Sequence, residues 1–166
     1  MPGPHEIFVV DTSSLLSVRE TYGREAEKEL FSGLSDLVAK GALVYPPQVL
    51  HELELGSESA TNPDPPVLWA RTHQAKATIK PALDRVKETL GKVPDVIDPD
   101  AKHEQADPYI LTLAVQLKEE GYDVVVVTED RRDKPAKTSL ATACGVLKIP
   151  TVPLRAFLRS EGLADR

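Results

Sequence analysis

The sequence lacks the features that mark secreted or membrane proteins. Its one cysteine, Cys144, cannot form a disulfide within the chain, so a reducing compartment is expected. The apolar runs are far too short to cross a bilayer. Residues 1–6 also lack the basic segment and the long apolar run of a signal peptide. These absences predict a cytoplasmic protein without a membrane segment.

An excess of basic residues is missing as well. The 166 residues include 20 lysines and arginines against 26 aspartates and glutamates, which gives a net charge of −6. This balance excludes a protein that coats nucleic acid through general positive charge. It does not exclude an enzyme with a local phosphate site, because each bound divalent cation would cancel two negative charges. With 41% hydrophobic residues, the chain fits a single domain over residues 1–166.

Short apolar runs alternate with stretches of helical periodicity. Residues 7–10 and 124–127 are unbroken apolar runs, typical of strands that are buried on both faces of a parallel sheet. Residues 43–45 predict another strand, and weaker patterns predict strands at 96–97 and 147–149. The predicted helices lie at residues 30–40, 47–53, 69–90 with a break at Pro81, 108–120, around 141–144, and 154–161.

This alternation predicts an α/β fold with three layers. Helices would cover both faces of a central, mostly parallel sheet of four to five strands. The turn-rich residues 56–66 predict a loop, and residues 56–103 predict an insertion of helices and loops within the domain. Ligands bind such sheets at the carboxyl ends of the strands. The residues that follow the strands are therefore candidates for a functional site.

Acidic residues occupy several of these positions. Asp11 directly follows the first strand, Asp130 lies three residues beyond Val127, Asp107 precedes the clearest helix, and Glu52 lies on the short helix after the second strand. Each has a purely structural alternative: Asp11 and Asp107 could cap helices, Glu52 could be solvated, and Asp130 could pair with neighbouring arginines. Only convergence would indicate a site, because clustered carboxylates repel one another unless a cation such as Mg²⁺ or Mn²⁺ offsets them.

Four segments that hold these residues resemble the PIN-domain superfamily, which includes the VapC-type toxins of bacterial toxin–antitoxin pairs. The segments are residues 8–14, 49–53, 106–114 and 127–130, in that order along most of the chain. The resemblance implies a PIN-like fold with an acidic metal site formed by Asp11, Glu52, Asp107 and Asp130. Residues 56–103 depart from a compact PIN toxin and are similar to its longer relatives.

The resemblance also implies supporting roles around the four carboxylates. Thr128 would orient the last of them or a bound water, and Ser13 would act in a similar way. Two choices stay open between neighbouring carboxylates: Glu129 could replace Asp130, and Glu54 could replace Glu52.

The implied activity is that of an endoribonuclease that depends on Mg²⁺ or Mn²⁺. The metals would lower the pKa of a water and steady the charge that develops on an RNA phosphate. Cations beyond Asp130 could grip the flanking phosphates, although a solvated loop is the alternative; they are Arg131, Arg132, Lys134 and Lys137. Because the sequence shows no module that would restrain such an enzyme, we expect a toxin that an antitoxin protein holds inactive. A homodimer is also compatible with the resemblance.

Other chemistries match the sequence less well. A zinc protease is excluded because Leu55 stands where the motif that begins at His51 needs its second histidine. A phosphoryl transferase of the haloacid-dehalogenase type needs an aspartate at the position of Ser13. No Walker loop is present. A PIN-like module that binds RNA or protein without cleavage, and a housekeeping RNA-processing nuclease, remain alternatives.

Overall fold

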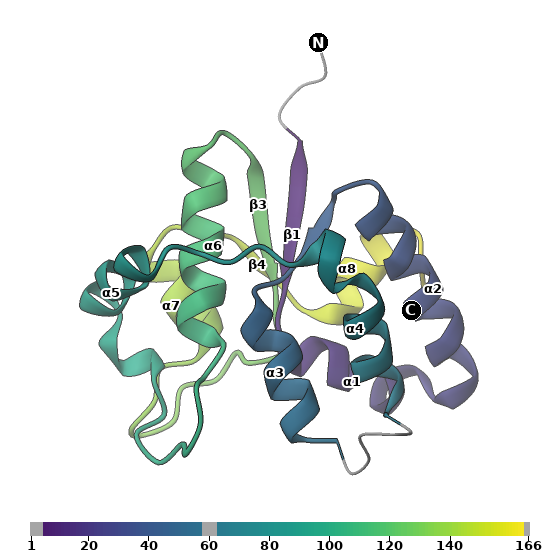
Figure 1. Ribbon diagram of the computed structural model, residues 1–166, viewed down its shortest axis with the longest axis horizontal. Coiled ribbons are helices and arrows are strands. Elements are labelled where there is room, and N and C mark those ends of the chain that lie inside the picture. Colours follow the sequence, from purple (N-terminus) through teal and green to yellow (C-terminus); the bar gives the residue numbers. More distant parts are fainter. Residues whose placement is uncertain (1–4, 58–62, 165–166) are drawn as a thin grey trace.

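The strands form one parallel sheet of four. They are β1 (Glu6–Val10), β2 (Leu43–Val44), β3 (Asp123–Val127) and β4 (Thr151–Val152). The computed structural model describes residues 5–57 and 63–164, and its strand order is β2-β1-β3-β4 (Figure 1). β1 and β3 are the central pair, and their apolar side chains are largely buried because helices cover both faces. The predicted α/β class is confirmed.

Helices form a layer on each face of this sheet. They are α1 (Thr12–Tyr22), α2 (Arg24–Ala39), α3 (Pro47–Leu55), α4 (Pro65–Ala77), α5 (Leu83–Lys92), α6 (Asp107–Glu119), α7 (Leu140–Val146) and α8 (Leu154–Ser160). In Figure 1, α5, α6 and α7 lie to the left of β1 and β3, and α1, α2, α4 and α8 lie to the right. This arrangement agrees with the predicted three layers. None of the helices in the described residues is long and apolar enough to cross a membrane.

The carboxyl ends of the central strands meet the starts of two helices. β1 and β3 end toward the bottom of Figure 1, where α1 and α6 begin. The backbone N–H of Asp11, directly after β1, donates to the carbonyl of Val127 at the end of β3 (3.2 Å). α6 runs back along the sheet and packs on β1 and β3, so its first residue, Asp107, lies at this same edge. The topology therefore brings Asp11, Asp107 and the residues that follow β3, which include Asp130, to the same edge of the sheet.

The strand predicted at residues 96–97 is wrong. Residues Pro94–Val96 form a short 3₁₀ helix, in which Val96 donates its N–H to the carbonyl of Val93 (3.3 Å). The carbonyl of Asp95 instead accepts the N–H of Thr138 (2.8 Å) from the loop after β3. Val96 is apolar because it is buried in the core, which explains the misleading pattern.

The last strand begins later than predicted at 147–149. There the chain closes the end of α7, because the N–H groups of Leu147, Lys148 and Ile149 donate to carbonyls of α7. Lys148 has a positive φ of 61°, which a strand does not tolerate. β4 starts at Thr151, directly after Pro150, and pairs with β3.

The predicted insertion, residues 56–103, contains two helices and the 3₁₀ helix. α4 packs on α2 and α3, and α5 packs on α6. The predicted break at Pro81 is confirmed, since it lies between α4 and α5. Of the loop predicted at 56–66, residues 58–62 lie outside the described part, and α4 already begins at Pro65.

Candidate active site

A pocket at the carboxyl ends of β1 and β3 is lined by all of the predicted acidic residues. Its volume is about 480 Å³. Asp11 reaches it from the end of β1, Glu52 from α3, Asp107 from the start of α6, and Asp130 from the loop after β3. We call this cavity, defined by these four carboxylates, the acidic pocket. Segments that lie far apart in the sequence thus converge at the edge where parallel sheets bind ligands.

Asp11 both caps α1 and belongs to the acidic pocket. Its Oδ1 accepts the N–H of Ser14 at 2.9 Å, so the capping interpretation of Asp11 is correct. Its Oδ2 accepts the hydroxyl of Ser13 at 2.8 Å and the hydroxyl of Thr128. The residue is 3% exposed, and this burial raises the pKa of Asp11, although the hydrogen bonds oppose the shift. The carboxylate is therefore held in one orientation at a site that disfavours its negative charge.

Thr128 joins the carboxylate of Asp11 to the backbone of Asp130. Its hydroxyl donates to Asp11 and accepts the backbone N–H of Asp130 at 2.9 Å. Ser13 acts in a similar way, since its hydroxyl donates to Asp11 and accepts the N–H of Glu129 at 3.2 Å. Both side chains thus tie the end of β1 to the loop that follows β3.

Glu52, and not Glu54, faces the acidic pocket. Its Oε1 accepts the hydroxyl of Thr12 at 2.5 Å, and its Oε2 accepts the N–H of Ala106 at 3.0 Å. Glu54 lies outside the pocket and forms an ion pair with Arg71 of α4 at 2.7 Å. Two residues apart on α3, the two side chains point in very different directions. The structure therefore favours Glu52.

Of Asp130 and Glu129, only Asp130 faces the acidic pocket. Asp130 lines the acidic pocket, and its Oδ2 accepts the N–H of Leu140 at the start of α7 (3.0 Å). The side chain of Glu129 points toward α8, and its Oε2 accepts the N–H of Leu154 at the start of that helix (3.1 Å). Each carboxylate thus holds a different helix, and only Asp130 lies in the pocket.

The interpretation of Asp107 as a helix cap is wrong. The N-cap of α6 is Ala106, whose N–H is bound by Glu52, and Asp107 is the first helical residue without a capping bond. Burial raises the pKa of Asp107 to about 7, Asp11 and Asp130 add to the shift, and Lys137 opposes it. Because Glu52 accepts the N–H of Ala106 at the start of α6, Asp107 does not cap the helix, and its carboxylate lies near those of Asp11 and Asp130.

Lys137 lies between two of these carboxylates. Its Nζ is 3.2 Å from Oδ2 of Asp107 and 3.3 Å from Oδ2 of Asp130. Burial acts to lower the pKa of Lys137, but the two carboxylates outweigh this effect and raise it. The lysine therefore remains charged at neutral pH and offsets part of the negative charge in the acidic pocket.

The other predicted cations are divided between the pocket and the surface. Arg132 and Lys134 line the acidic pocket together with Lys137. Arg131 lies outside it, where its Nη1 donates to the hydroxyl of Thr151 in β4 (3.2 Å). Two backbone hydrogen bonds between Lys134 and Lys137 (2.8 and 3.1 Å) close the loop that carries these residues.

Several residues of the pocket were not among those predicted. Thr12, whose hydroxyl donates to Glu52, lines the pocket and lies in the segment that carries the resemblance, so that segment could have revealed it. A second group lines the pocket from a segment without any recognisable pattern; it comprises Asp98, Ala101, His103 and Gln105. Only the packing of residues 98–105 against the sheet edge brings this group to the site.

The donor set matches a hard cation, but it is not assembled around one. Carboxylate oxygens are the ligands that Mg²⁺ and Mn²⁺ prefer. Within residues 5–57 and 63–164, however, no group of three or more histidines, cysteines and acids is spaced to hold a metal ion. Lys137 takes up the space between Asp107 and Asp130. A metal ion bound by both carboxylates would have to displace the lysine from them.

Comparison with known proteins assigns the chain to a family. It has no significant match among curated proteins. A family model does match, and it covers residues 8–164, a span that includes all four carboxylates of the acidic pocket. That model is described as a domain of unknown function, DUF4411. Since the match extends over nearly the whole sequence, the chain belongs to the DUF4411 family.

Proposed function

We propose that this protein is a PIN-type endoribonuclease that uses Mg²⁺ or Mn²⁺ to hydrolyse RNA phosphodiester bonds. The observation that supports the proposal most is the convergence of four carboxylates on one pocket at the carboxyl edge of the sheet. Burial raises the pKa of both Asp11 and Asp107. Such an arrangement is unfavourable without a cation, and perturbed acids in a cavity are typical of functional sites.

The carboxylates would divide the work of binding. Asp11, Asp107 and Asp130 would hold the metal, and Thr128 and Ser13 would keep Asp11 oriented toward it. When bound, the metal supplies Lewis-acid chemistry, which lowers the pKa of water and offsets charge on the phosphate.

Glu52 would have a different part, because it has no ion-pair partner among the described residues. Its carboxylate is fixed by Thr12 and by the N–H of Ala106. Each oxygen keeps a lone pair that can accept a hydrogen bond from the attacking water. Glu52 would thus orient that water toward the phosphate.

The cations of the loop after β3 would bind the RNA backbone. Arg132 and Lys134 line the acidic pocket and would contact flanking phosphates. Lys137 would leave Asp107 and Asp130 when metal binds and would then be free to pair with phosphate. The choice of RNA over DNA rests on the resemblance to PIN domains.

A module that binds without cleaving is the second candidate, and one observation favours it. Lys137 already neutralises part of the acidic pocket, as it would in a protein that needs no metal. Incubation of labelled single-stranded RNA with the purified protein, in Mn²⁺, in Mg²⁺ and in EDTA, separates the two. Cleavage that requires metal and is lost in Asp11→Asn supports the nuclease. RNA binding without cleavage under every condition contradicts it.

The proposal includes a partner protein that holds the enzyme inactive, as in toxin–antitoxin pairs. This part rests on the resemblance, and the negative acidic pocket would attract a basic side chain from such a partner. Expression in a bacterial host beside the Asp11→Asn form tests it. A toxin slows growth only in the wild-type form. Equal growth of the two cultures, with active enzyme in the first lysate, would contradict the toxin role and leave a housekeeping nuclease.

A further inference from the structure

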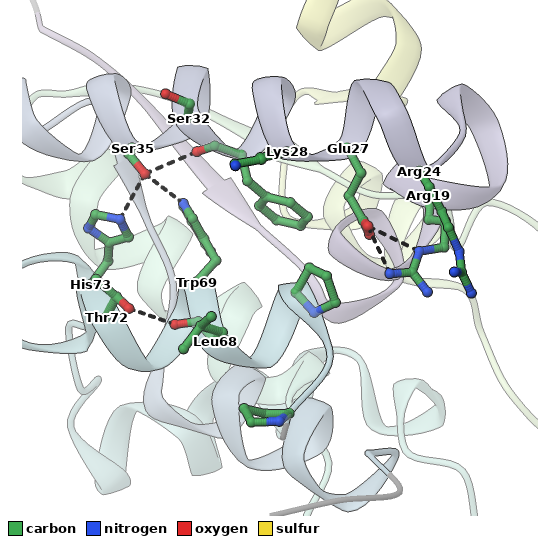
Figure 2. A pocket seen from close by; sticks show the side chains of 13 residues that line it. Arg19, Arg24, Glu27, Lys28, Ser32, Ser35, Leu68, Trp69, Thr72 and His73 are labelled. Carbon is green, nitrogen blue, oxygen red and sulfur yellow. Dashed lines mark hydrogen bonds and ion pairs between the residues drawn. The ribbon is translucent and has the colours of Figure 1, made fainter. Parts of the chain in front are cut away.

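A second cavity lies between α2 and α4. Its volume is about 570 Å³, within the range of pockets that bind small molecules (Figure 2). The described residues that line it form a set separate from those of the acidic pocket. We call it the α2–α4 pocket; its lining comprises Arg19, Arg24, Glu27, Lys28, Phe31, Ser32, Ser35, Pro63, Pro65, Leu68, Trp69, Thr72 and His73.

The middle of the α2–α4 pocket is apolar and aromatic. The rings of Phe31 and Trp69 pack with their centroids 5.6 Å apart. Pro63 and Pro65 are partly exposed beside them, and Leu68 is 56% exposed. Phe31 and Trp69 are each only 6% exposed, so an aromatic or aliphatic group that entered here would remove mainly the surface of Leu68 and the two prolines from water.

A network of polar groups fixes one end of the pocket. The hydroxyl of Ser35 accepts the indole N–H of Trp69 at 3.0 Å and lies 2.8 Å from Nε2 of His73. It also reaches the carbonyl of Phe31 at 3.0 Å, and Figure 2 shows these contacts as one cluster. Because the three side chains satisfy one another, a ligand would not have to order the indole ring. Such preorganisation favours binding.

Positive side chains line the cavity along the first two turns of α2. Arg19 forms an ion pair with Glu27 at 2.9 Å, so these two cancel. Arg24 and Lys28 are exposed and have no ion-pair partner in the part of the chain that the structure describes. Figure 2 shows Arg24 beyond Glu27 and Lys28 between Glu27 and Ser35. In a protein with a net charge of −6, they make the α2 side of the cavity locally positive.

We infer that the α2–α4 pocket binds a small amphipathic anion with an aromatic body and a carboxylate or sulfonate group. The body would pack against Leu68 and the prolines beside Phe31 and Trp69, and the anionic group would lie toward the unpaired cations of α2 that line the pocket, Arg24 and Lys28. This site is independent of the proposed nuclease activity, because the two pockets are lined by different residues.

The test uses two fluorescent probes that share an aromatic body and differ in charge. They are 1-anilinonaphthalene-8-sulfonate, an anion, and N-phenyl-1-naphthylamine, which is neutral. The natively folded wild-type protein should bind the sulfonate at one saturable site and more tightly than the neutral probe. Alanine at both Arg24 and Lys28 should weaken the sulfonate about three- to tenfold, as expected for two partly exposed ion pairs, and leave the neutral probe unchanged.

One blocking variant and two control variants keep the test specific. Alanine at Lys87 and Lys92, exposed residues of α5, removes the same charge far from the cavity and should change nothing. Ser32→Trp places a large ring in the α2–α4 pocket from an exposed position and should abolish binding of both probes. Ala75→Trp puts the same ring on an exposed part of α4 outside the lining and should not. Circular dichroism confirms that each variant is folded.

Three outcomes would overturn the inference. One is equal binding of the sulfonate to wild type and Ser32→Trp, which would mean adsorption elsewhere. Another is equal loss of affinity in the two alanine pairs, which would mean an effect of overall charge. The last is a wild-type dimer in light scattering that Ser32→Trp converts to a monomer, which would make the cavity an interface between copies of the chain. Cleavage of RNA is not needed for any of these readouts.

Discussion

The acidic pocket and the α2–α4 pocket differ in the sign of the charged residues that line them and in which of these residues form ion pairs. The acidic pocket is lined by five carboxylates, the four predicted ones and Asp98, and by three cations, of which Lys137 lies between Asp107 and Asp130. In the α2–α4 pocket, the one carboxylate is neutralised by Arg19, and two cations at the rim stay unpaired among the described residues. The first region should therefore attract cations and the second anions. The predictions below test the acidic pocket, and the first of them compares it directly with the α2–α4 pocket.

The largest effect is expected from Asp11→Asn. Loss of one metal-binding carboxylate should reduce RNA cleavage about a thousandfold or more, a change in barrier of about 4 kcal/mol. The fold should persist, because asparagine can also cap α1 at this position. Cleavage rates and thermal unfolding measure the two quantities. Sulfonate binding in the α2–α4 pocket should stay at the wild-type level, and a parallel loss would instead indicate a folding defect.

The pH dependence of stability should be next in size. The pKa of Asp107 is about 7 in the folded protein and 3.8 when unperturbed, so the folded state binds more protons between these values. Stability from this group is full below about pH 4 and is lost as the pH rises toward 7, by about 1.4 kcal/mol per pKa unit. Urea unfolding of metal-free protein should show this decline. An unchanged slope in Asp107→Asn would assign the decline to other groups.

Lys137→Met should have a smaller effect, a loss of stability in the metal-free protein. Without the lysine, Asp107 and Asp130 lose their shared counter-ion, so the metal-free protein should be destabilised by about 1–3 kcal/mol. Added Mn²⁺ should then restore more stability than it adds to wild type, because the lysine no longer competes. Thermal unfolding with and without Mn²⁺ measures both. If Mn²⁺ stabilises the two proteins equally, Lys137 does not occupy the metal position.

The sequence predicted the architecture because its strongest signals are local. The runs at residues 7–10 and 124–127 could only be strands buried on both faces, and α/β alternation then determines where ligands bind. The failed strands at 96–97 and 147–149 each contain one buried apolar residue, Val96 or Ile149, next to an exposed residue, and they form turns and helix ends in place of strands. Periodicity alone cannot distinguish burial in a strand from burial in a turn.

The acidic pocket could be predicted only in outline. The positions of Asp11 and Asp130 follow from the strand ends, but the choice of Glu52 over Glu54 depends on how α3 is rotated. The position of Lys137 between two carboxylates depends on a loop that no sequence rule describes. The α2–α4 pocket was not predicted from the sequence. The cavity exists only through the packing of α4 on α2.

The central claim is that the acidic pocket is a cation site, and titration calorimetry with Mn²⁺ tests it most directly. Two matched pairs of variants sharpen the test: Glu52→Gln with Glu54→Gln, and Asp130→Asn with Glu129→Gln. In each pair, the first residue lines the pocket and the second lies outside it. We predict saturable Mn²⁺ binding to wild type, Glu54→Gln and Glu129→Gln, with at least tenfold weaker binding to Asp130→Asn, which loses a proposed ligand. Glu52→Gln should show a smaller loss, because it removes negative charge from the pocket but no proposed ligand. No binding to wild type, or equal binding to all five proteins, would contradict the account.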